Sequence, residues 1–125
     1  MNNSARSGRL VIEAAGLRFQ NPVLLAAGTA AYGRELRDVV ELDTLGGLVT
    51  KAVSPRPRVG AVAPRVAEFP GGMINAVGLA NPGVEMVKRD YLAWLGSHIP
   101  NTRKLINVVG STPDDFPSVI VGIEE

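Results

Sequence analysis

The chain has 125 residues, of which 46% are hydrophobic and 20% are charged, a composition typical of globular proteins. Its net charge of +1 is too small to attract nucleic acid or anionic lipid electrostatically. No apolar stretch approaches the roughly 20 residues that a membrane span needs. The absence of cysteine excludes disulfides and thiolate metal sites, so we expect a cytoplasmic protein without metal, membrane or nucleic-acid partners.

The amino-terminal region divides into a tail and a short hairpin. Residues 1–9 are polar and contain no apolar core, which is typical of a disordered tail rather than of a secretory signal peptide. Residues 10–12 and 17–19 are apolar-rich and flank Ala14-Ala15-Gly16, which predicts an antiparallel β-hairpin with a glycine turn. We expect residues 10–125 to form one domain.

Three apolar runs of strand length follow along the chain. They occupy residues 23–27, 48–53 and 104–110, and each has the continuous apolar character of a strand buried on both faces. Such strands are typical of parallel sheets.

Helical patterns lie between and after these runs. Residues 33–42 carry apolar side chains at positions i, i+3 and i+4, which predicts an amphipathic helix. A second helix is predicted over residues 81–96, with Asn81 as its N-cap and Pro82 in its first turn. A third is predicted from Thr112, with Asp115 as the acid of a capping box.

The alternation of strands and helices predicts an α/β fold built from βαβ units with right-handed crossovers. Three strands are too few to close a barrel. The chain is therefore either a small open sheet or a piece of a larger protein.

Residues 54–80 have little pattern, and a structureless stretch of this length is rare in a compact domain unless it carries a function. Loops that follow parallel strands gather at the carboxyl edge of the sheet, where α/β barrels bind ligands. We therefore expect Lys51, Asn75, Asn107 and the Ala27-Gly28-Thr29 turn to meet there.

Each of these residues also has a purely structural interpretation. Lys51 could cap its strand and reach solvent, although a lysine in an apolar strand favours an anionic ligand. Asn75 could serve a turn, and the Asn107 amide could be satisfied by backbone groups. His98 follows the end of the second helix and is predicted to be a surface residue. Glycine-rich dinucleotide and phosphate loops and paired metal ligands are absent from the sequence.

Several segments together resemble one enzyme family. They are Asn21-Pro22-Val23, Ala26-Ala27-Gly28-Thr29, Val49-Thr50-Lys51-Ala52, Pro64-Arg65-Val66-Ala67-Glu68, Gly72-Met73-Ile74-Asn75-Ala76-Val77-Gly78-Leu79-Ala80-Asn81-Pro82-Gly83 and Asn107-Val108-Val109-Gly110-Ser111. In order and spacing they are similar to the amino-terminal part of class 1 dihydroorotate dehydrogenases, especially those that pair with an electron-transfer subunit.

The resemblance implies a fold and an activity. The chain would be the first three βα units of a (β/α)8 TIM barrel, preceded by a short β-hairpin. The family binds FMN and oxidises dihydroorotate to orotate in de novo pyrimidine (UMP) biosynthesis. The whole enzyme would be a homodimer, or a heterotetramer with an FAD and iron–sulfur subunit.

The resemblance also assigns roles to individual residues. The implied FMN-binding residues are Ala27, Lys51, Ala52 and Asn107. The implied substrate-binding residues are Lys51, Asn75, Ala76, Val77, Gly78 and Leu79. Many relatives have serine where this chain has Ala27, so only a backbone contact to FMN would remain at this position.

No catalytic residue is assigned in this chain, because the class 1 base is a cysteine on a loop after the fourth strand, beyond Glu125. We therefore expect the 125 residues alone to be inactive. Two alternatives remain open. One is another FMN barrel of pyrimidine metabolism, and the other is a non-catalytic half-barrel that pairs exposed strand edges with a second copy or a complementary fragment.

Overall fold

A computed structural model describes residues 10–124, and the tail predicted over residues 1–9 lies outside this range. The chain forms two compact units. The first comprises the chain up to Lys51 together with Arg89–Asn107, and the second comprises Ala52–Lys88 and the chain from Val108 onward. Within residues 10–124, no helix has the length and apolar character needed to cross a bilayer.

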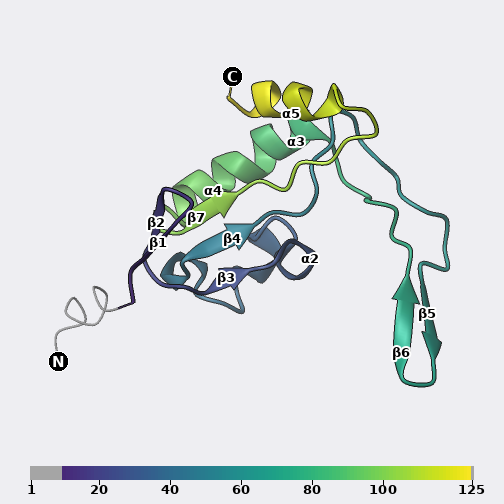
Figure 1. Cartoon of the computed structure of the whole chain (residues 1–125), viewed down its shortest axis with the longest axis horizontal. Coiled ribbons are helices and arrows are strands. Elements are labelled where there is room, and N and C mark those ends of the chain that lie inside the picture. The colour runs from purple at the N-terminus through teal and green to yellow at the C-terminus, as the bar shows by residue number, and fades with distance from the viewer. Residues whose placement is uncertain (1–9, 125) are drawn as a thin grey trace. The chain divides into compact units, whose positions relative to one another are not determined.

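The first unit contains a three-stranded parallel sheet with short helices. Its strands are β3 (Leu24–Leu25), β4 (Gly47–Val49) and β7 (Arg103–Leu105), in the order β3-β4-β7 (Figure 1). β4 is parallel to both neighbours, so the carboxyl ends of all three strands share one edge. The α/β class expected from the sequence is confirmed.

The strands are shorter than the apolar runs that predicted them. The run at residues 23–27 turns into the short helix α2 (Ala27–Ala30), because the amides of Thr29 and Ala30 both donate to the Ala26 carbonyl. Alanine has the highest helix propensity and no branch at Cβ, so an alanine-rich strand end converts readily into a helical turn. Past the ends of β4 and β7, Val53 pairs with Val108 through an isolated β-bridge.

A hairpin precedes the sheet. β1 (Ile12–Ala14) pairs antiparallel with β2 (Leu17–Phe19), and both Ala15 and Gly16 have positive φ. Two consecutive residues of this kind are characteristic of the tight turns that join twisted hairpin strands. Phe19 is buried and attaches the hairpin to the unit.

The amphipathic helix predicted over residues 33–42 is wrong. The segment contains the 3-10 helix η1 (Arg34–Leu36) and, after a turn, the 3-10 helix η2 (Leu42–Thr44). Val39, expected on the apolar face, is 79% exposed. Helices this short gain little from propagation, so packing of Leu36 and Leu42 decides the local conformation instead.

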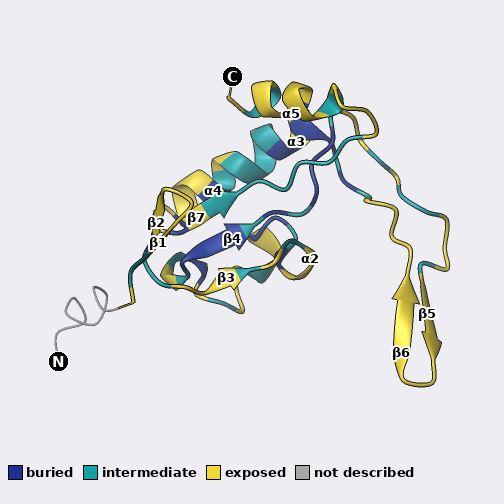
Figure 2. Ribbon diagram, in the orientation of Figure 1, coloured by how far each residue is buried: buried dark blue, intermediate teal, exposed yellow. Residues whose placement is uncertain are grey.

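The core of the first unit lies between the sheet and α4 (Ala93–His98). Figure 2 shows β4 as its buried central strand. The buried residues of this cluster are Ala30, Leu42, Leu48, Leu95 and Ile99.

Hydrogen bonds close the amino-terminal edge of the same sheet. The Asp43 carboxylate accepts the Asn101 amide at 2.8 Å. The Thr102 hydroxyl donates to the carbonyls of Leu42 at 2.8 Å and Leu45 at 2.9 Å. Thr102 is almost fully buried, so these bonds fix the start of β7 beside the start of β4.

The second helix differs from its prediction at its start. The helical stretch consists of α3 (Val84–Met86), a π-helical segment η3 (Val87–Leu92) and α4, and its cap is Gly83. Asn81 lies before the helix, where its side-chain oxygen accepts the Gly83 amide at 2.9 Å and the Ser54 hydroxyl at 3.0 Å. The positive φ of Gly83 explains the delayed start, because a residue at φ 81° is outside the helical region.

In the second unit, residues predicted to lack regular structure form a hairpin. β5 (Val66–Phe69) pairs antiparallel with β6 (Gly72–Asn75), and all eight residues are exposed (Figure 2). One face carries Phe69 and Ile74, which are apolar and more than half exposed. We refer to residues 58–80, which include this hairpin, as the arm.

The last helix, α5 (Asp115–Glu124), packs on α3 through the buried residues Val84 and Val119. It begins three residues later than predicted. The Asp115 carboxylate still reaches back, as a capping-box acid does, and accepts the amides of Ser111 at 2.6 Å and Thr112 at 3.1 Å.

These two bonds predict a pH dependence. Hydrogen bonding from Ser111 and then Thr112 lowers the Asp115 pKa below its usual range. Stability from a carboxyl with a depressed pKa is present above the unfolded pKa of about 4 and is lost as pH falls through the folded value. We expect the thermal unfolding midpoint of Asp115→Asn to fall less steeply than that of the wild type as the pH is lowered from 6 to 2. Circular dichroism measures this midpoint at each pH. Asp114→Asn, which keeps the Asp115 bonds, should retain the wild-type slope; an equal loss of slope in both variants would contradict this assignment.

Candidate functional site

Three predicted residues share the carboxyl edge of the parallel sheet. Ala27, Lys51 and Asn107 each lie two residues after the last residue of their strand, β3, β4 and β7 respectively. The Lys51 backbone amide donates to the Ala31 carbonyl at 2.6 Å, which joins the end of β4 to the end of α2. The structure therefore brings these three residues to the same edge within the first unit.

Thr50 connects the other two strand ends. Its side chain is fully buried. Its backbone amide donates to the Leu105 carbonyl at 2.9 Å, and its hydroxyl oxygen accepts a hydrogen bond from the backbone amide of Asn107 at 3.2 Å. Sequence reasoning missed Thr50 as a residue of the site. The available signal was a hydroxyl within an otherwise apolar strand.

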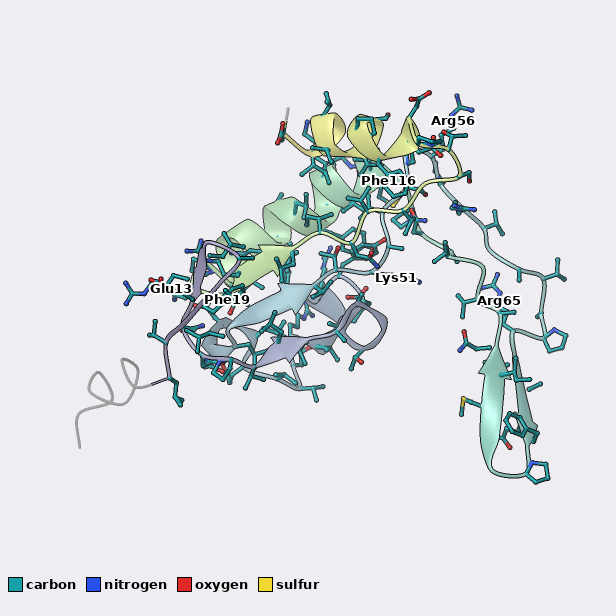
Figure 3. All side chains as sticks on the ribbon, viewed as in Figure 1. Glu13, Phe19, Lys51, Arg56, Arg65 and Phe116 are labelled. Atoms are coloured by element: carbon teal, nitrogen blue, oxygen red, sulfur yellow. The ribbon has the colours of Figure 1, made fainter. Side chains whose placement is uncertain are left out.

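The Lys51 side chain is half-buried where the chain leaves β4 (Figure 3). Among residues 10–124, the ion pairs join Arg37 to Asp38 and Arg89 to Asp90, and none involves Lys51. A partly desolvated ammonium without a carboxylate partner favours an anionic ligand over a structural role. Ala52, the next residue, is buried in the second unit.

The predicted substrate loop follows β6 in the second unit. Asn75 pairs with Val66 at the end of the hairpin, and the Ala76 amide donates to the Arg65 carbonyl at 2.8 Å. The Val77 carbonyl accepts the Ala61 amide at 3.1 Å. The loop residues Asn75, Ala76, Val77, Gly78 and Leu79 are all exposed.

Arg65 braces the segment opposite this loop. Its guanidinium donates to the carbonyls of Ala61 at 2.6 Å and Val59 at 3.0 Å (Figure 3 labels Arg65 at the base of the hairpin). These hydrogen bonds to the backbone could not be predicted from the position of Arg65 in the sequence.

Gly78 occupies a position that other residues could not adopt without strain. Its φ is 73°, and a Cβ there would lie 2.5 Å from the Ala61 nitrogen. We expect Gly78→Ala to displace the loop from residues 60–61 and to lower stability by about 1–3 kcal/mol, as strained backbone does. Urea denaturation and the amide chemical shifts of Ala61 and Val77 would measure both effects.

Gly71→Ala is the matched control, since it also has positive φ but no atom within 4 Å of an added Cβ. It should carry the conformational cost without the shift at Ala61. Equal shifts at Ala61 in both variants would contradict the clash.

Two other features lie away from the predicted residues. An open cleft of about 640 Å³ in the second unit is lined by Arg56, Arg58, Asp114, Asp115 and neighbouring residues, so its charges balance. His98 is exposed and stacks on Trp94 with ring centroids 4.6 Å apart, which confirms it as a surface residue. Neither feature includes a residue assigned to the site.

The family model described as dihydroorotate dehydrogenase matches residues 9–125. The chain belongs to the dihydroorotate dehydrogenase family. Two named groups of relatives are similar to it. Dihydroorotate dehydrogenase A (fumarate) of Lactiplantibacillus plantarum is 42% identical over 112 residues, which cover 90% of this chain and 37% of the relative.

The second group consists of proteins named dihydroorotate dehydrogenase B (NAD(+)), catalytic subunit. Those of Pelobacter propionicus and Streptococcus pneumoniae are each 40% identical, over 93% and 95% of this chain. The chain spans 38% of the length of each of these two relatives.

The fold is also similar to that of a solved dihydroorotate dehydrogenase. A crystal structure of the Eimeria tenella enzyme in complex with ferulenol matches with a TM-score of 0.67, covering 98% of this chain and 35% of the other. At 20% identity this likeness shows the shared fold alone.

Proposed function

We propose that this chain forms the first three βα units of the (β/α)8 barrel of an FMN-dependent dihydroorotate dehydrogenase, with β1 and β2 as the preceding hairpin. The whole enzyme would oxidise dihydroorotate to orotate in pyrimidine biosynthesis. The observation that carries this proposal is the placement of Ala27, Lys51 and Asn107 at the carboxyl edge of one parallel sheet. This is the edge at which α/β barrels bind ligands and perform chemistry.

The donors at this edge fit an electron-rich cofactor. Lys51 offers a half-buried cation without an ion-pair partner among residues 10–124, and Asn107 offers a carboxamide that can donate and accept. Ala27 and Ala52 have methyl side chains without polar atoms, so their polar contacts to a ligand would come from the backbone. We assign Ala27, Lys51, Ala52 and Asn107 to FMN binding.

When bound, FMN supplies the acceptor for the hydride that leaves dihydroorotate. Lys51 would stabilise negative charge on its ligands and orient the substrate carboxylate, because a fixed cation in a partly desolvated site interacts strongly with developing charge. The carboxamide of Asn75 and the backbone groups of Ala76, Val77, Gly78 and Leu79 would bind the pyrimidine edges and carboxylate without adding net charge. We assign no catalytic base to these residues.

Titration of the folded chain with FMN, followed by quenching of flavin fluorescence, tests the assignment. We expect saturable binding that strengthens when orotate is added, since Lys51 is assigned to both ligands. Circular dichroism in parallel establishes that the chain is folded. A folded chain that leaves flavin fluorescence unchanged at all concentrations would overturn the proposal.

The partner of the whole enzyme is a separate proposal. Because several relatives are named as catalytic subunits, we propose a cytoplasmic enzyme that pairs with an FAD and iron–sulfur subunit in a heterotetramer. The relative named for fumarate favours a second possibility, a homodimer without that subunit. Copurification of an iron–sulfur flavoprotein with the enzyme from its source would support the first, and a flavoprotein containing FMN alone would support the second.

A non-catalytic interaction module remains the alternative function. The exposed apolar face of β5 and β6 and the outer edges of the three-stranded sheet favour it. A flavin-free dimer in size-exclusion chromatography would support this alternative, whereas a monomer that binds FMN and orotate would support the enzyme.

A further inference from the structure

Thr50 is a buried polar residue whose backbone amide and hydroxyl bond to residues at and just after the end of β7. It directly precedes Lys51, and its side chain is fully buried. Valine would fill nearly the same volume and suits a buried strand at least as well. Packing therefore does not explain why a hydroxyl stands here.

The hydroxyl has a specific partner. Its oxygen accepts a hydrogen bond from the backbone amide of Asn107 at 3.2 Å, and the two residues are 57 positions apart in the sequence. The backbone amide of Thr50 donates to Leu105 at 2.9 Å, so backbone and side chain together attach Thr50 to the end of β7. The side-chain bond extends the β4–β7 connection two residues past the last strand residue of β7.

Lys51 is held on its other side by the end of α2. Its backbone amide donates to the carbonyl of Ala31, the residue after α2, at 2.6 Å. The dipeptide Thr50-Lys51 is thus attached both to the end of β7 and to the end of α2. Of these three hydrogen bonds, the one to the Thr50 hydroxyl involves a side chain. Loss of that hydroxyl would leave the Asn107 amide without its acceptor, which is costly in a half-buried site.

We propose that Thr50 is a positioning residue that fixes Asn107 relative to Lys51 through its hydroxyl. Its importance for flavin binding rests on the proposed function, since Lys51 and Asn107 are the residues assigned there. Because its own side chain is fully buried, Thr50 would act by fixing the backbone positions of Lys51 and Asn107.

The test compares Thr50→Val and Thr50→Ser with Thr102→Val and Thr102→Ser in the complete 125-residue chain. Thr102 is the matched control because it is also buried and its hydroxyl also bonds across strands, but at the amino edge of the sheet. Hydrogen exchange of the Asn107 amide in the flavin-free chain measures the proposed bond directly. The Arg103 amide, which donates to Gly46, serves as the internal reference.

We expect Thr50→Val to accelerate Asn107 exchange by about tenfold relative to Arg103 and to weaken FMN affinity by a similar factor, as loss of one hydrogen bond would. Thr50→Ser, which keeps the hydroxyl, should restore both. Thr102→Val should lower stability while leaving FMN affinity within about twofold of wild type.

The outcomes separate the two proposals. Unchanged Asn107 exchange in Thr50→Val would overturn the positioning role whatever the flavin result. A wild-type chain that binds FMN with an affinity that Thr50→Val leaves unchanged would overturn it as well. A folded wild-type chain that binds no FMN would overturn the proposed function, and the role of Thr50 in flavin binding would fall with it even if the hydrogen bond is real.

Discussion

Replacing Lys51 with glutamine is expected to weaken binding of orotate to the FMN-loaded chain by roughly tenfold to a hundredfold, because a hydrogen bond to a charged group contributes about 1.5–3 kcal/mol. Glutamine keeps most of the side-chain length and the capacity to donate, so the change isolates the positive charge. The amide of residue 51 would still donate to Ala31, and the sheet edge should keep its shape. Isothermal titration with orotate measures the effect.

The control for this charge is Lys88→Gln, which makes the same substitution in the π-helical segment η3 of the second unit. It should leave orotate affinity within about twofold, since Lys88 is not assigned to either ligand. Equal losses in the two variants would mean that orotate responds to net charge and that Lys51 has no specific contact with it.

Leu48→Ala is expected to destabilise the first unit by about 3 kcal/mol, within the range of 2–5 kcal/mol for buried leucines. Leu48 is fully buried at the centre of β4, and its Cδ1 atom lies 3.0 Å from the position that a Cβ on Gly33 would occupy. Leu48 belongs to the buried cluster with Ala30, Leu42, Leu95 and Ile99, so truncation leaves a cavity within this cluster. Urea denaturation gives the change in the free energy of unfolding.

Leu10→Ala makes the same chemical change at a position that is 57% exposed. It should alter the free energy of unfolding by no more than about 0.5 kcal/mol. If both variants lost similar stability, the cluster around β4 would not be the core of the unit.

The sequence predicted those parts of the fold that depend on continuous apolar runs. Three such runs indicated parallel strands buried on both faces, and β3, β4 and β7 overlap them. The burial prediction holds for β4 but is wrong for the other two strands, because Leu24 in β3 and Arg103 in β7 are exposed. Strand lengths were overestimated, because an apolar residue such as Ala27 satisfies a buried helical turn as well as a strand. Periodicity alone does not distinguish the two over a few residues.

Helix boundaries and the arm were not predictable from local pattern. Asn81 and Pro82 form a typical helix start signal. In the structure, however, the Asn81 side-chain oxygen accepts hydrogen bonds from the Ser54 hydroxyl and the Gly83 amide, and the helix begins after Gly83. The strands β5 and β6 are exposed on both faces and so lack the alternation that marks a half-buried hairpin. Long-range hydrogen bonds therefore determine where the helix starts, and exposure of both faces hides the hairpin from a pattern-based prediction.

The same distinction applies to the site. Lys51 could be proposed as a site residue from the sequence alone, because a cation in an apolar run departs from the pattern of its surroundings. Thr50 violates that pattern more weakly, since threonine is common in strands, and its role depends on a partner 57 residues away. Such a pairing becomes visible only when β4 and β7 are adjacent.

The division of the first unit into two stretches has a consequence for the evolution of the chain. The intervening segment, Ala52–Lys88, connects these two stretches along the chain. The entropy of closing such a loop rises only with the logarithm of its length, and even a doubling costs about 0.6 kcal/mol. Insertions or deletions in the exposed arm should therefore be nearly neutral for folding of the parallel sheet. Natural variation in arm length should then leave the sheet edge that carries Lys51 and Asn107 unchanged.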